Sequence, residues 1–311
     1  MHHHSLPLIA AILFATLAGA ATSAKPTLDL DAFEKSMQTA RLPNGTNIGF
    51  MDRGPRDGVP VVLIHGFTNN ARSWTPLIPY LDPRFRLILI DVRGHGISSK
   101  PECCYTRLDM AYDVKLLLDQ MHIASAHIIG HSLGSIVSQM FAETWPERTR
   151  HVVLIGSTGG VRADCNGGDA TLKSPLPGMR AELLKLKDPI DPNSPFMSAW
   201  YGNAMAPDPD VVRRQRRDAA AIPVRVWLAI LDQGVTGMDL QATLPRLTAP
   251  TLLIWGDKDT LMPEPVRCAL REALPNARVH VFPTYGHNPA WDDPAAVAAL
   301  INPFINETVG P

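Results

Sequence analysis

The chain has 311 residues, of which 45% are hydrophobic and 19% are charged, so it can bury a full core without help from metals or partners. Its 29 basic and 30 acidic residues give a formal net charge of -1. This balance argues against nucleic acid as a partner, because phosphate binding needs a basic surface. One large domain that acts on a neutral small molecule is the simplest expectation.

The first 24 residues have the features of a secretory signal peptide. Residues 6–21 (LPLIAAILFATLAGAA) are apolar and uncharged, and small residues precede Lys25. This stretch is shorter than the roughly 20 residues that a membrane-spanning helix needs. We therefore predict cleavage after Ala24, a secreted or periplasmic protein, and no stable membrane insertion once the signal is removed. An uncleaved anchor is the alternative, and the histidines at positions 2–4 are assigned no metal role.

The four cysteines allow three disulfide pairings, among which sequence cannot choose. Export would place these cysteines where disulfides persist. Cys103 and Cys104 are adjacent, so they could bond to each other only through a strained ring, and a bridge from one of them to Cys165 is an alternative. Cysteines that stay reduced, Cys268 among them, are the remaining possibility.

Residues 38–52 (QTARLPNGTNIGFMD) alternate in polarity around Asn44-Gly45, a pair that tolerates the positive φ angles of a tight turn. A β-hairpin is therefore expected to open the mature chain. Six short apolar runs follow, each ended by turn residues, at 61–66, 86–94, 126–132, 151–157, 251–259 and 278–287. Near-continuous Val, Ile and Leu predict strands that are covered on both faces, as in a parallel sheet.

Segments with helical spacing separate these runs, at residues 69–81, 108–121, 135–145, 264–274 and 293–305. Alternating strands and helices imply right-handed βαβ units with helices on both faces of one sheet.

Residues from about 158 to 240 break this alternation, because they are rich in Pro and Gly and contain no clear strand. Their aromatic residues include Phe196, Trp200, Tyr201 and Trp227. An insertion of this length is seldom a bare loop, so we predict a mostly helical lid. The mature chain, residues 25–311, is then a single domain with this lid at about 158–240.

The run at 126–132 leads into Gly130-His131-Ser132-Leu133-Gly134, a G-x-S-x-G pattern. In such a pattern the serine occupies a strained strand-to-helix turn that projects its hydroxyl over the sheet edge. The glycines are needed because a Cβ at either position would collide with neighbouring backbone. Ser132 is therefore a candidate nucleophile, and the helix that follows favours negative charge at its amino end.

A serine hydroxyl needs a neighbouring base, and His287, in YGHNPAW after the last apolar run, can supply one. An orienting carboxylate is expected between serine and histidine in the chain, where GDKD offers Asp257 and Asp259. We assign the orienting role to Asp259, where the chain has cleared the sheet edge. Asp257 directly follows a glycine, so we expect it to bind amides of its own turn.

Two backbone N–H groups are also required to hold the carbonyl oxygen as it gains charge. We expect them from Leu133, which follows the serine, and from Phe67, in the loop after the run at 61–66. His95 and His131 lie in motifs beside the site, and we expect them to serve packing or hydrogen bonding rather than proton transfer.

Five motifs together resemble the blocks of the α/β-hydrolase family, in the order in which that family has them. They are HGF at His65, DVRGHGISSKP from Asp91, GHSLG from Gly130, WGDKDTLMP from Trp255 and YGHNP at Tyr285. The resemblance covers residues from about 41 to 304 apart from the lid. It implies a mostly parallel central sheet with helices on both faces, hydrolysis by a Ser-His-Asp triad without cofactor or metal, and substrate choice by the lid.

The sequence therefore predicts a serine hydrolase that cleaves carboxylic esters, or lactones, of small to medium apolar compounds through Ser132, Asp259 and His287. Two alternatives are open. The same triad could hydrolyse a carbon-carbon bond or form peracids, or the protein could bind a ligand with negligible turnover. Neither the accepted acyl and alcohol groups nor the oligomeric state can be predicted.

Overall fold

The computed structural model describes residues 27–160, 165, 176, 178–202, 207–236 and 240–307. The predicted signal peptide, residues 1–24, lies outside these described residues, so its cleavage stays a prediction. Within the described part of the chain, no helix is both long and apolar enough to cross a membrane.

A single sheet of eight strands runs through the described chain, in the order β1-β2-β4-β3-β5-β6-β7-β8. Strands β3 to β8 are parallel to one another, whereas β2 is antiparallel to both of its neighbours, β1 and β4. The strands are Gln38–Arg41 (β1), Asn47–Arg53 (β2), Val59–Ile64 (β3), Phe85–Ile90 (β4), Ala126–His131 (β5), Thr149–Ile155 (β6), Thr251–Gly256 (β7) and Arg278–Phe282 (β8). The predicted mostly parallel sheet is confirmed, because each of the six apolar runs forms a strand and these six strands are parallel.

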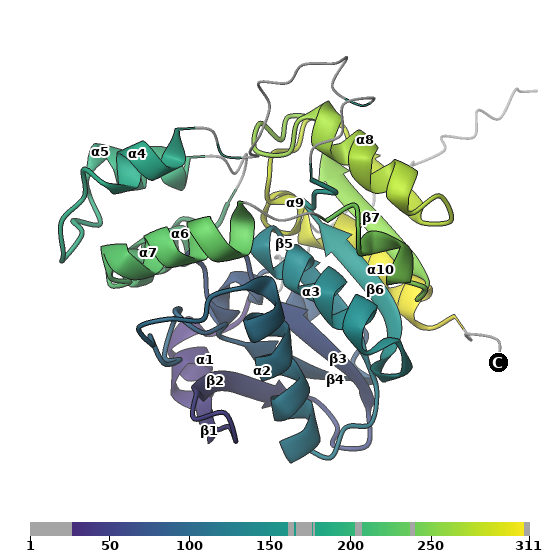
Figure 1. The fold of residues 1–311 in the computed structure, drawn as a ribbon. Helices are drawn as coiled ribbons and strands as arrows, with labels where there is room; N and C mark the ends of the chain where they lie inside the picture. Colours follow the sequence, from purple (N-terminus) through teal and green to yellow (C-terminus); the bar gives the residue numbers. More distant parts are fainter. Residues whose placement is uncertain are drawn as a thin grey trace, which may run out of the picture.

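Both faces of the sheet are covered, since alternate residues of a strand point to opposite faces. Val152 and Leu154 of β6 pack toward α3 and α8, whereas Val153 and Ile155 pack toward α10. One face carries Arg107–Gln120 (α2), Leu133–Thr144 (α3) and Glu264–Ala273 (α8) (Figure 1). The other carries Leu30–Ser36 (α1), Ala71–Trp74 (η1), Ile78–Tyr80 (η2), Pro289–Asp292 (α9) and Pro294–Ile305 (α10).

The helix predicted at 69–81 is wrong, because this segment contains only the two short 3-10 turns η1 and η2. Pro76 and Pro79 lack the amide hydrogens that a continuous α-helix would use, so the helical hydrogen bonding is interrupted there. Trp74 and Leu77 are nevertheless buried, which explains the helix-like spacing of the apolar residues.

The expectation that the hairpin opens the mature chain is also wrong, because helix α1 precedes it. Asp29 caps this helix by accepting hydrogen bonds from the amides of Asp31 and Ala32, at 2.9 and 3.0 Å. Phe33 is its one buried residue. A single buried position gives no helical period that sequence analysis could detect.

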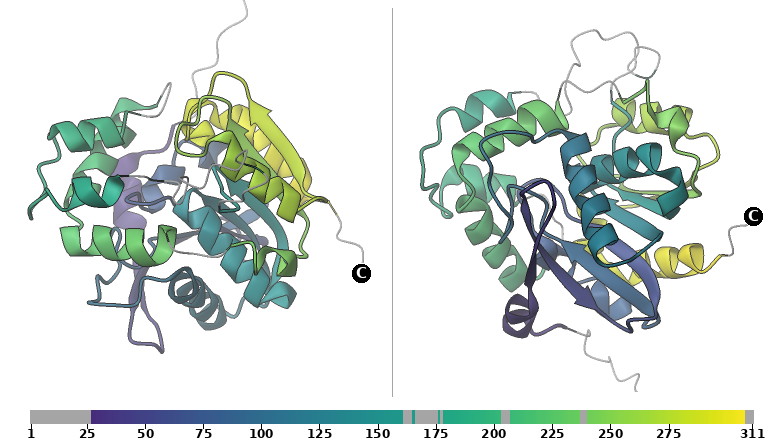
Figure 2. Two further views of the ribbon diagram at one scale, coloured as in Figure 1. Left: turned by 45° about the horizontal axis from the view of Figure 1, so that its top comes forward. Right: turned by 60° about the horizontal axis from the view of Figure 1, so that its bottom comes forward.

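Between β6 and β7, the described residues form mainly helices. They are Met179–Leu183 (α4), Pro195–Trp200 (α5), Pro209–Ala220 (α6), Val224–Ile230 (α7), the π-helical turn Leu231–Val235 (η4) and the 3-10 turn Leu244–Arg246 (η5). Helices α4 to α7 gather beside the body that contains the sheet (Figures 1 and 2). Their role as a lid stays a prediction.

Two disulfides are formed, Cys103–Cys104 and Cys165–Cys268. The adjacent cysteines thus bond to each other, and neither alternative, a bridge to Cys165 or reduced thiols, is seen. Cys165 reaches Cys268 because the chain that leaves β6 runs along α8, where the Gly159 amide donates a hydrogen bond to the Val266 carbonyl at 3.1 Å.

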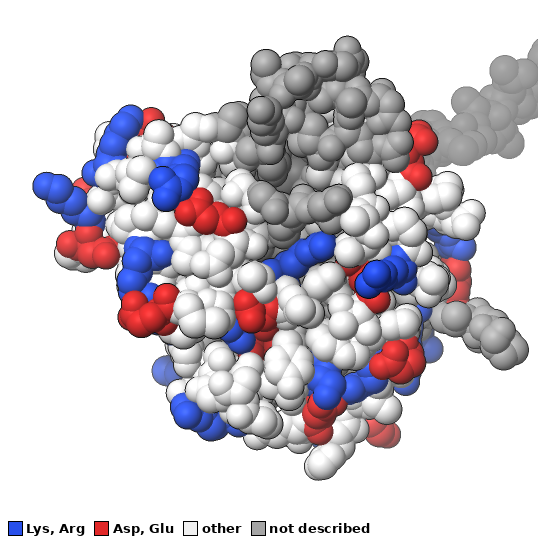
Figure 3. Space-filling view, in the orientation of Figure 1, with Lys and Arg blue, Asp and Glu red and all other residues white. Residues whose placement is uncertain are grey.

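The surface charge is mixed. Acidic and basic side chains are interspersed on the face drawn in Figure 3, with no broad basic area among the described residues of that face. This distribution agrees with the near-zero net charge and with a small-molecule substrate rather than a polyanion.

Candidate active site

Ser132 occupies the sharp turn between β5 and α3, at φ 53° and ψ -120°, a strained conformation for a residue with a side chain. Its amide is anchored to the sheet by donating a hydrogen bond to the Ile155 carbonyl at 2.9 Å. A Cβ at Gly130 would lie 2.3 Å from the Gly134 carbonyl oxygen, and one at Gly134 would lie 2.0 Å from that of Ile64. Both glycines are therefore required, as the motif predicts.

The turn that carries Ser132, between β5 and α3, is called the elbow below. It lies where the strand order of the sheet reverses. Strand β3 is flanked by β4 on one side and β5 on the other, so the chain leaves β3 and β5 in opposite directions. Ligands of open parallel sheets bind at such a point, outside the carboxyl ends of the strands. The loop after β3 packs directly on the elbow, because a Cβ at Gly66 would lie 3.1 Å from the Ser132 Cβ.

Asp259 and His287 form a buried pair. The Nδ1 of His287 lies 2.8 Å from Oδ2 of Asp259, and the other carboxylate oxygen accepts hydrogen bonds from the amides of Leu261 and Met262 at 2.9 and 3.0 Å. Burial acts to raise the pKa of Asp259, but the charge of His287 and these hydrogen bonds leave it below its usual value. An ionised Asp259 accepts the Nδ1 hydrogen, which leaves Nε2 of His287 as the basic nitrogen.

Asp257 has a different partner. Its Oδ1 accepts a hydrogen bond from the Thr284 amide at 2.7 Å, and its side chain is 39% exposed, with Lys258 3.5 Å away. The expectation that it binds amides of its own turn is therefore wrong, because Thr284 belongs to the loop after β8. Asp257 thus joins two neighbouring loops.

Ser132 and His287 line the same pocket. The Nε2 of His287 is buried and has no hydrogen-bond partner among the described residues, so the serine-histidine hydrogen bond that the motif predicts is not formed in this structure. Such bonds are often long in proteins without substrate and tighten when substrate binds. Because no described group occupies Nε2, this nitrogen can accept a proton from Ser132 once that bond forms.

The two expected oxyanion donors lie at the same pocket. Leu133 is the first residue of α3, where amide hydrogens have no partner within the helix. The Phe67 amide donates to no group among the described residues. Both N–H groups are therefore available to a substrate oxygen.

A polar network that the sequence analysis missed lies beneath the elbow. The Ser135 hydroxyl is 2.6 Å from the Ser132 carbonyl and 2.7 Å from the Ser157 hydroxyl, to which Gln139 also donates at 2.9 Å. Ser157 lies just after β6. Ser135 and Gln139 are four positions apart, so they lie on the same side of α3, the side that faces β6. This helical spacing of two polar residues was the signal in the sequence that could have revealed the network.

The family assignment comes from comparison with known proteins. The family model described as the alpha/beta hydrolase fold matches residues 59–294, which is well over half of the chain. The chain belongs to the alpha/beta hydrolase fold family. The match includes every residue of the predicted triad and both predicted oxyanion donors.

Several known proteins are similar to this alpha/beta hydrolase. A 2-hydroxy-6-oxononadienedioate/2-hydroxy-6-oxononatrienedioate hydrolase of Cupriavidus pinatubonensis is 29% identical over 79% of this chain and 86% of its own length. Lipase 3 of a Moraxella species is 25% identical over 90% of this chain and 91% of its own. The crystal structure of a hydrolase from Pseudomonas aeruginosa, 25% identical, superposes with a TM-score of 0.73 over 87% of this chain and 98% of that one. These relatives support a hydrolase that acts on small molecules.

The pocket of this alpha/beta hydrolase is apolar apart from the site itself. Its described lining residues are the apolar and aromatic Phe67, Leu133, Ile136, Leu176, Trp200, Tyr201, Val235, Leu261, Met262 and Trp291, together with Gly66, Asn69, His131, Ser132, His287 and Asn288. No Lys, Arg, Asp or Glu is among them. Most of these residues lie within a sequence motif of the site or close to one. Leu176, Trp200, Tyr201 and Val235 come instead from the predicted lid, and the sequence did not assign them to the pocket.

The other histidines near the site have structural contacts, as expected. His131 lies 2.8 Å from the His287 carbonyl through Nε2, and burial lowers its pKa to about 3. His95 accepts the Thr68 amide at 3.0 Å, and burial lowers its pKa to about 4. Both are therefore neutral at ordinary pH. Among the described residues, no group of three or more His, Cys, Asp or Glu side chains is arranged to hold a metal ion.

Proposed function

We propose that this alpha/beta hydrolase is a serine esterase for uncharged carboxylic esters, lactones included, of small to medium apolar compounds. The observation that carries the proposal is the buried Asp259-His287 pair, because His287 lines the same apolar pocket as Ser132 and its Nε2 has no partner among the described residues. An ester of this kind presents a carbonyl carbon for attack and no charge that the pocket would have to neutralise.

The proposed reaction has two steps. The Ser132 oxygen attacks the ester carbonyl while Nε2 of His287 takes the hydroxyl proton, and the Phe67 and Leu133 amides hold the oxygen that becomes negative. The alcohol then leaves with that proton, and the acyl group stays on Ser132. Water adds to the acyl group with the same proton transfers, which releases the acid and restores the serine.

The composition of the pocket favours esters over the carbon-carbon bond hydrolysis considered as an alternative. The name of the Cupriavidus relative describes a dicarboxylate substrate. Burying a carboxylate without a cationic or hydrogen-bonding partner is unfavourable by several kcal/mol or more. Because no Lys or Arg is among the described lining residues, a neutral substrate fits this pocket better.

A substrate panel tests the proposed function. Neutral p-nitrophenyl esters of increasing acyl length are compared with a vinylogous diketone that carries a carboxylate, and Ser132→Ala serves as the control for background hydrolysis. We expect Ser132-dependent release of p-nitrophenol and no cleavage of the diketone. Rapid cleavage of the diketone with negligible ester turnover would show that the substrate class is wrong. Stoichiometric labelling of Ser132 without turnover of any substrate would favour the ligand-binding alternative.

The pH dependence of ester hydrolysis should report one histidine. His287 must be neutral to accept the serine proton, so kcat/KM is expected to fall as the medium is acidified, by up to about tenfold per pH unit. His131 and His95, with pKa values of about 3 and 4, stay neutral over this range and add no second step. The measurement is kcat/KM between pH 5 and 8, with His280→Gln, on strand β8 away from the pocket, as the matched variant. A flat profile from a folded protein would exclude His287 as the base.

Acyl-chain preference is expected to depend on the predicted lid. Val235 of η4 lines the pocket, so Val235→Ala should enlarge it and raise the hexanoate-to-acetate ratio of kcat/KM by about tenfold. Leu184→Ala, at a lid position that is 58% exposed, should leave this ratio unchanged. Equal ratios in the wild type and in Val235→Ala would contradict a lid that selects the acyl group.

Export is also proposed. The apolar residues 6–21 and the two disulfides support an oxidising compartment, where such bonds persist. Amino-terminal sequencing of protein recovered from the periplasm or medium tests it, with Lys25 expected as the first residue.

A further inference from the structure

Thr68, the residue after the proposed oxyanion donor Phe67, has an unusual backbone. Its φ is 67°, in the left-handed region that β-branched residues rarely adopt, and it is only 1% exposed. A strained conformation of this kind persists only where surrounding contacts hold it. The Phe67 carbonyl and the Thr68 amide form one peptide unit, and the Phe67 amide lies on the other side of the Phe67 Cα. The groups that hold Thr68 therefore fix one side of Phe67 and restrict the directions that its amide can take.

Two of these groups come from the predicted lid. The indole Nε1 of Trp200 donates a hydrogen bond to Oγ1 of Thr68 at 2.8 Å, and the Tyr201 hydroxyl lies 3.2 Å from the Thr68 carbonyl oxygen. The third comes from the core, where His95 accepts the Thr68 amide. All of these side chains are buried or half-buried, so water does not readily replace the lost bonds.

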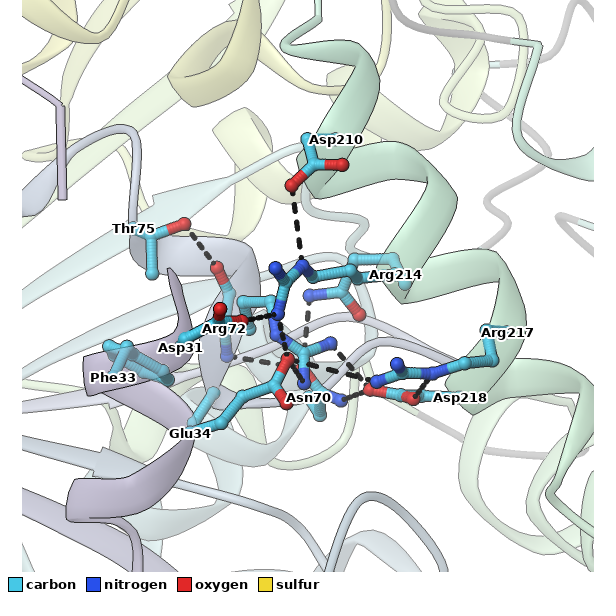
Figure 4. Close-up of polar contacts among 12 residues, drawn as sticks. Asp31, Phe33, Glu34, Asn70, Arg72, Thr75, Asp210, Arg214, Arg217 and Asp218 are labelled. Carbon is cyan, nitrogen blue, oxygen red and sulfur yellow. Dashed lines mark hydrogen bonds and ion pairs between the residues drawn. The ribbon is translucent and has the colours of Figure 1, made fainter. Parts of the chain in front are cut away.

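The attachment of the lid continues along the same loop. Gln215 of α6 donates to Oδ1 of Asn70 at 3.0 Å, and Asn70 donates to Asp218 at 2.8 Å. Arg72 lies between Asp218 of α6 and Glu34 of α1, as Figure 4 shows. Residues 67–72, from the loop after β3 into η1, thus carry the proposed oxyanion donor and the contacts to helices α5, α6 and α1.

Packing alone does not account for this arrangement. Trp200 also contacts the Phe67 ring, with centroids 5.9 Å apart, and that contact would bury the indole in many orientations. The Nε1 bond to Thr68 selects one orientation. The Tyr201 hydroxyl would likewise be buried at a cost unless it were hydrogen-bonded. Its acceptors include the Thr68 carbonyl oxygen and Oδ1 of Asn69, each 3.2 Å away in the loop after β3.

We propose that Trp200 and Tyr201 are positioning residues, which hold the Phe67 amide in the oxyanion site through Thr68 and so couple the placement of the lid to the rate of the chemical step. This inference rests on the proposed esterase function. It predicts that the lid affects kcat even for a substrate too small to touch it.

The test uses the full-length protein and p-nitrophenyl acetate. Thr68→Val removes the hydroxyl that accepts the Trp200 bond and keeps the shape of the side chain, whereas Thr68→Ser keeps the hydroxyl. Removing one oxyanion donor outright lowers kcat by about 100-fold to 1,000-fold, so a misplaced donor should lower kcat by about 10-fold to 100-fold. We expect this loss in Thr68→Val, with KM within about threefold of the wild type and recovery of kcat in Thr68→Ser.

Trp200→Phe and Tyr201→Phe remove the two lid donors and keep the rings. We expect a similar loss of kcat in each, and a Thr68→Val, Trp200→Phe double variant no worse than Thr68→Val, because the bond that Trp200→Phe breaks is already lost in Thr68→Val. Trp145→Phe and Tyr112→Phe are matched controls, since these residues stack on each other outside the site and should leave kcat unchanged.

A second readout separates positioning from general loosening. A neutral boronic acid becomes tetrahedral when the Ser132 oxygen adds to boron, and one boronate oxygen then occupies the oxyanion site. Its inhibition constant should rise by the same factor by which kcat falls in each variant. Wild-type kcat and inhibition in folded Thr68→Val, Trp200→Phe and Tyr201→Phe would overturn the inference. Ester hydrolysis that survives Ser132→Ala would overturn the proposed function instead.

Discussion

Ser132→Ala is expected to abolish nearly all ester hydrolysis and all labelling by fluorophosphonate probes. The substitution removes the only atom that the proposed mechanism uses to form the acyl-enzyme, while the strained turn and both glycine contacts remain. In a serine protease, loss of the nucleophile lowers kcat by about 10⁶, and the residual rate comes from binding and the oxyanion site. We expect a loss of at least about 10⁴ here, with circular dichroism and thermal unfolding like those of the wild type.

Ser125→Ala is the matched control for this variant. Ser125 directly precedes β5, at the opposite end of the strand from Ser132, and its hydroxyl accepts a hydrogen bond from Arg150. Rates and labelling should therefore match the wild type. Normal turnover by a folded Ser132→Ala protein would rule out the serine mechanism.

Asp259→Asn is expected to lower kcat by orders of magnitude with the fold intact. The amide oxygen can still accept the Leu261 and Met262 amides, but the amide nitrogen then faces Nδ1 of His287. Nδ1 must in that case accept a hydrogen bond, so the ring proton moves to Nε2 and points toward Ser132. The same substitution in a serine protease triad lowers kcat by about 10⁴ because the tautomer is wrong.

Asp257→Asn provides the comparison, since it makes the same chemical change two residues away. Asparagine can keep the bond from the Thr284 amide, and the position is partly exposed, so we expect kcat within about threefold of the wild type and a small change in stability. Steady-state kinetics on both proteins decide the assignment. A collapse of kcat in Asp257→Asn with near-normal rates in Asp259→Asn would reverse it.

The parts of the fold that sequence analysis predicted correctly have local causes. The parallel strands could be recognised because Val, Ile and Leu fill both faces, and β6 does have alternate residues in opposite cores. The elbow could be recognised because its serine and both glycines lie in one short motif, even though the backbone that crowds Gly134 belongs to Ile64 on the adjacent strand. Helix α1 was missed because one buried residue in seven positions leaves no period.

The errors share a different cause. The partner of Asp257 lies 27 positions along the chain, so its own turn was the wrong place to look. At residues 69–81 the apolar spacing was genuine, but the two prolines redirect the backbone into 3-10 turns that still bury Trp74 and Leu77. In both cases, contacts from other parts of the chain or steric limits overrode the local pattern.

By itself, the sequence determined the fold family and gave the prediction of Ser132, Asp259 and His287 as the triad, because both depend on short motifs at the ends of apolar strands. Only the tertiary structure decided that the pocket has no charged lining among its described residues and that Trp200 and Tyr201 reach Thr68. The physical reason is the length of chain between the partners. Trp200 and Thr68 are 132 positions apart, so no sequence period records their hydrogen bond, and only the packing of the predicted lid against the loop after β3 creates it.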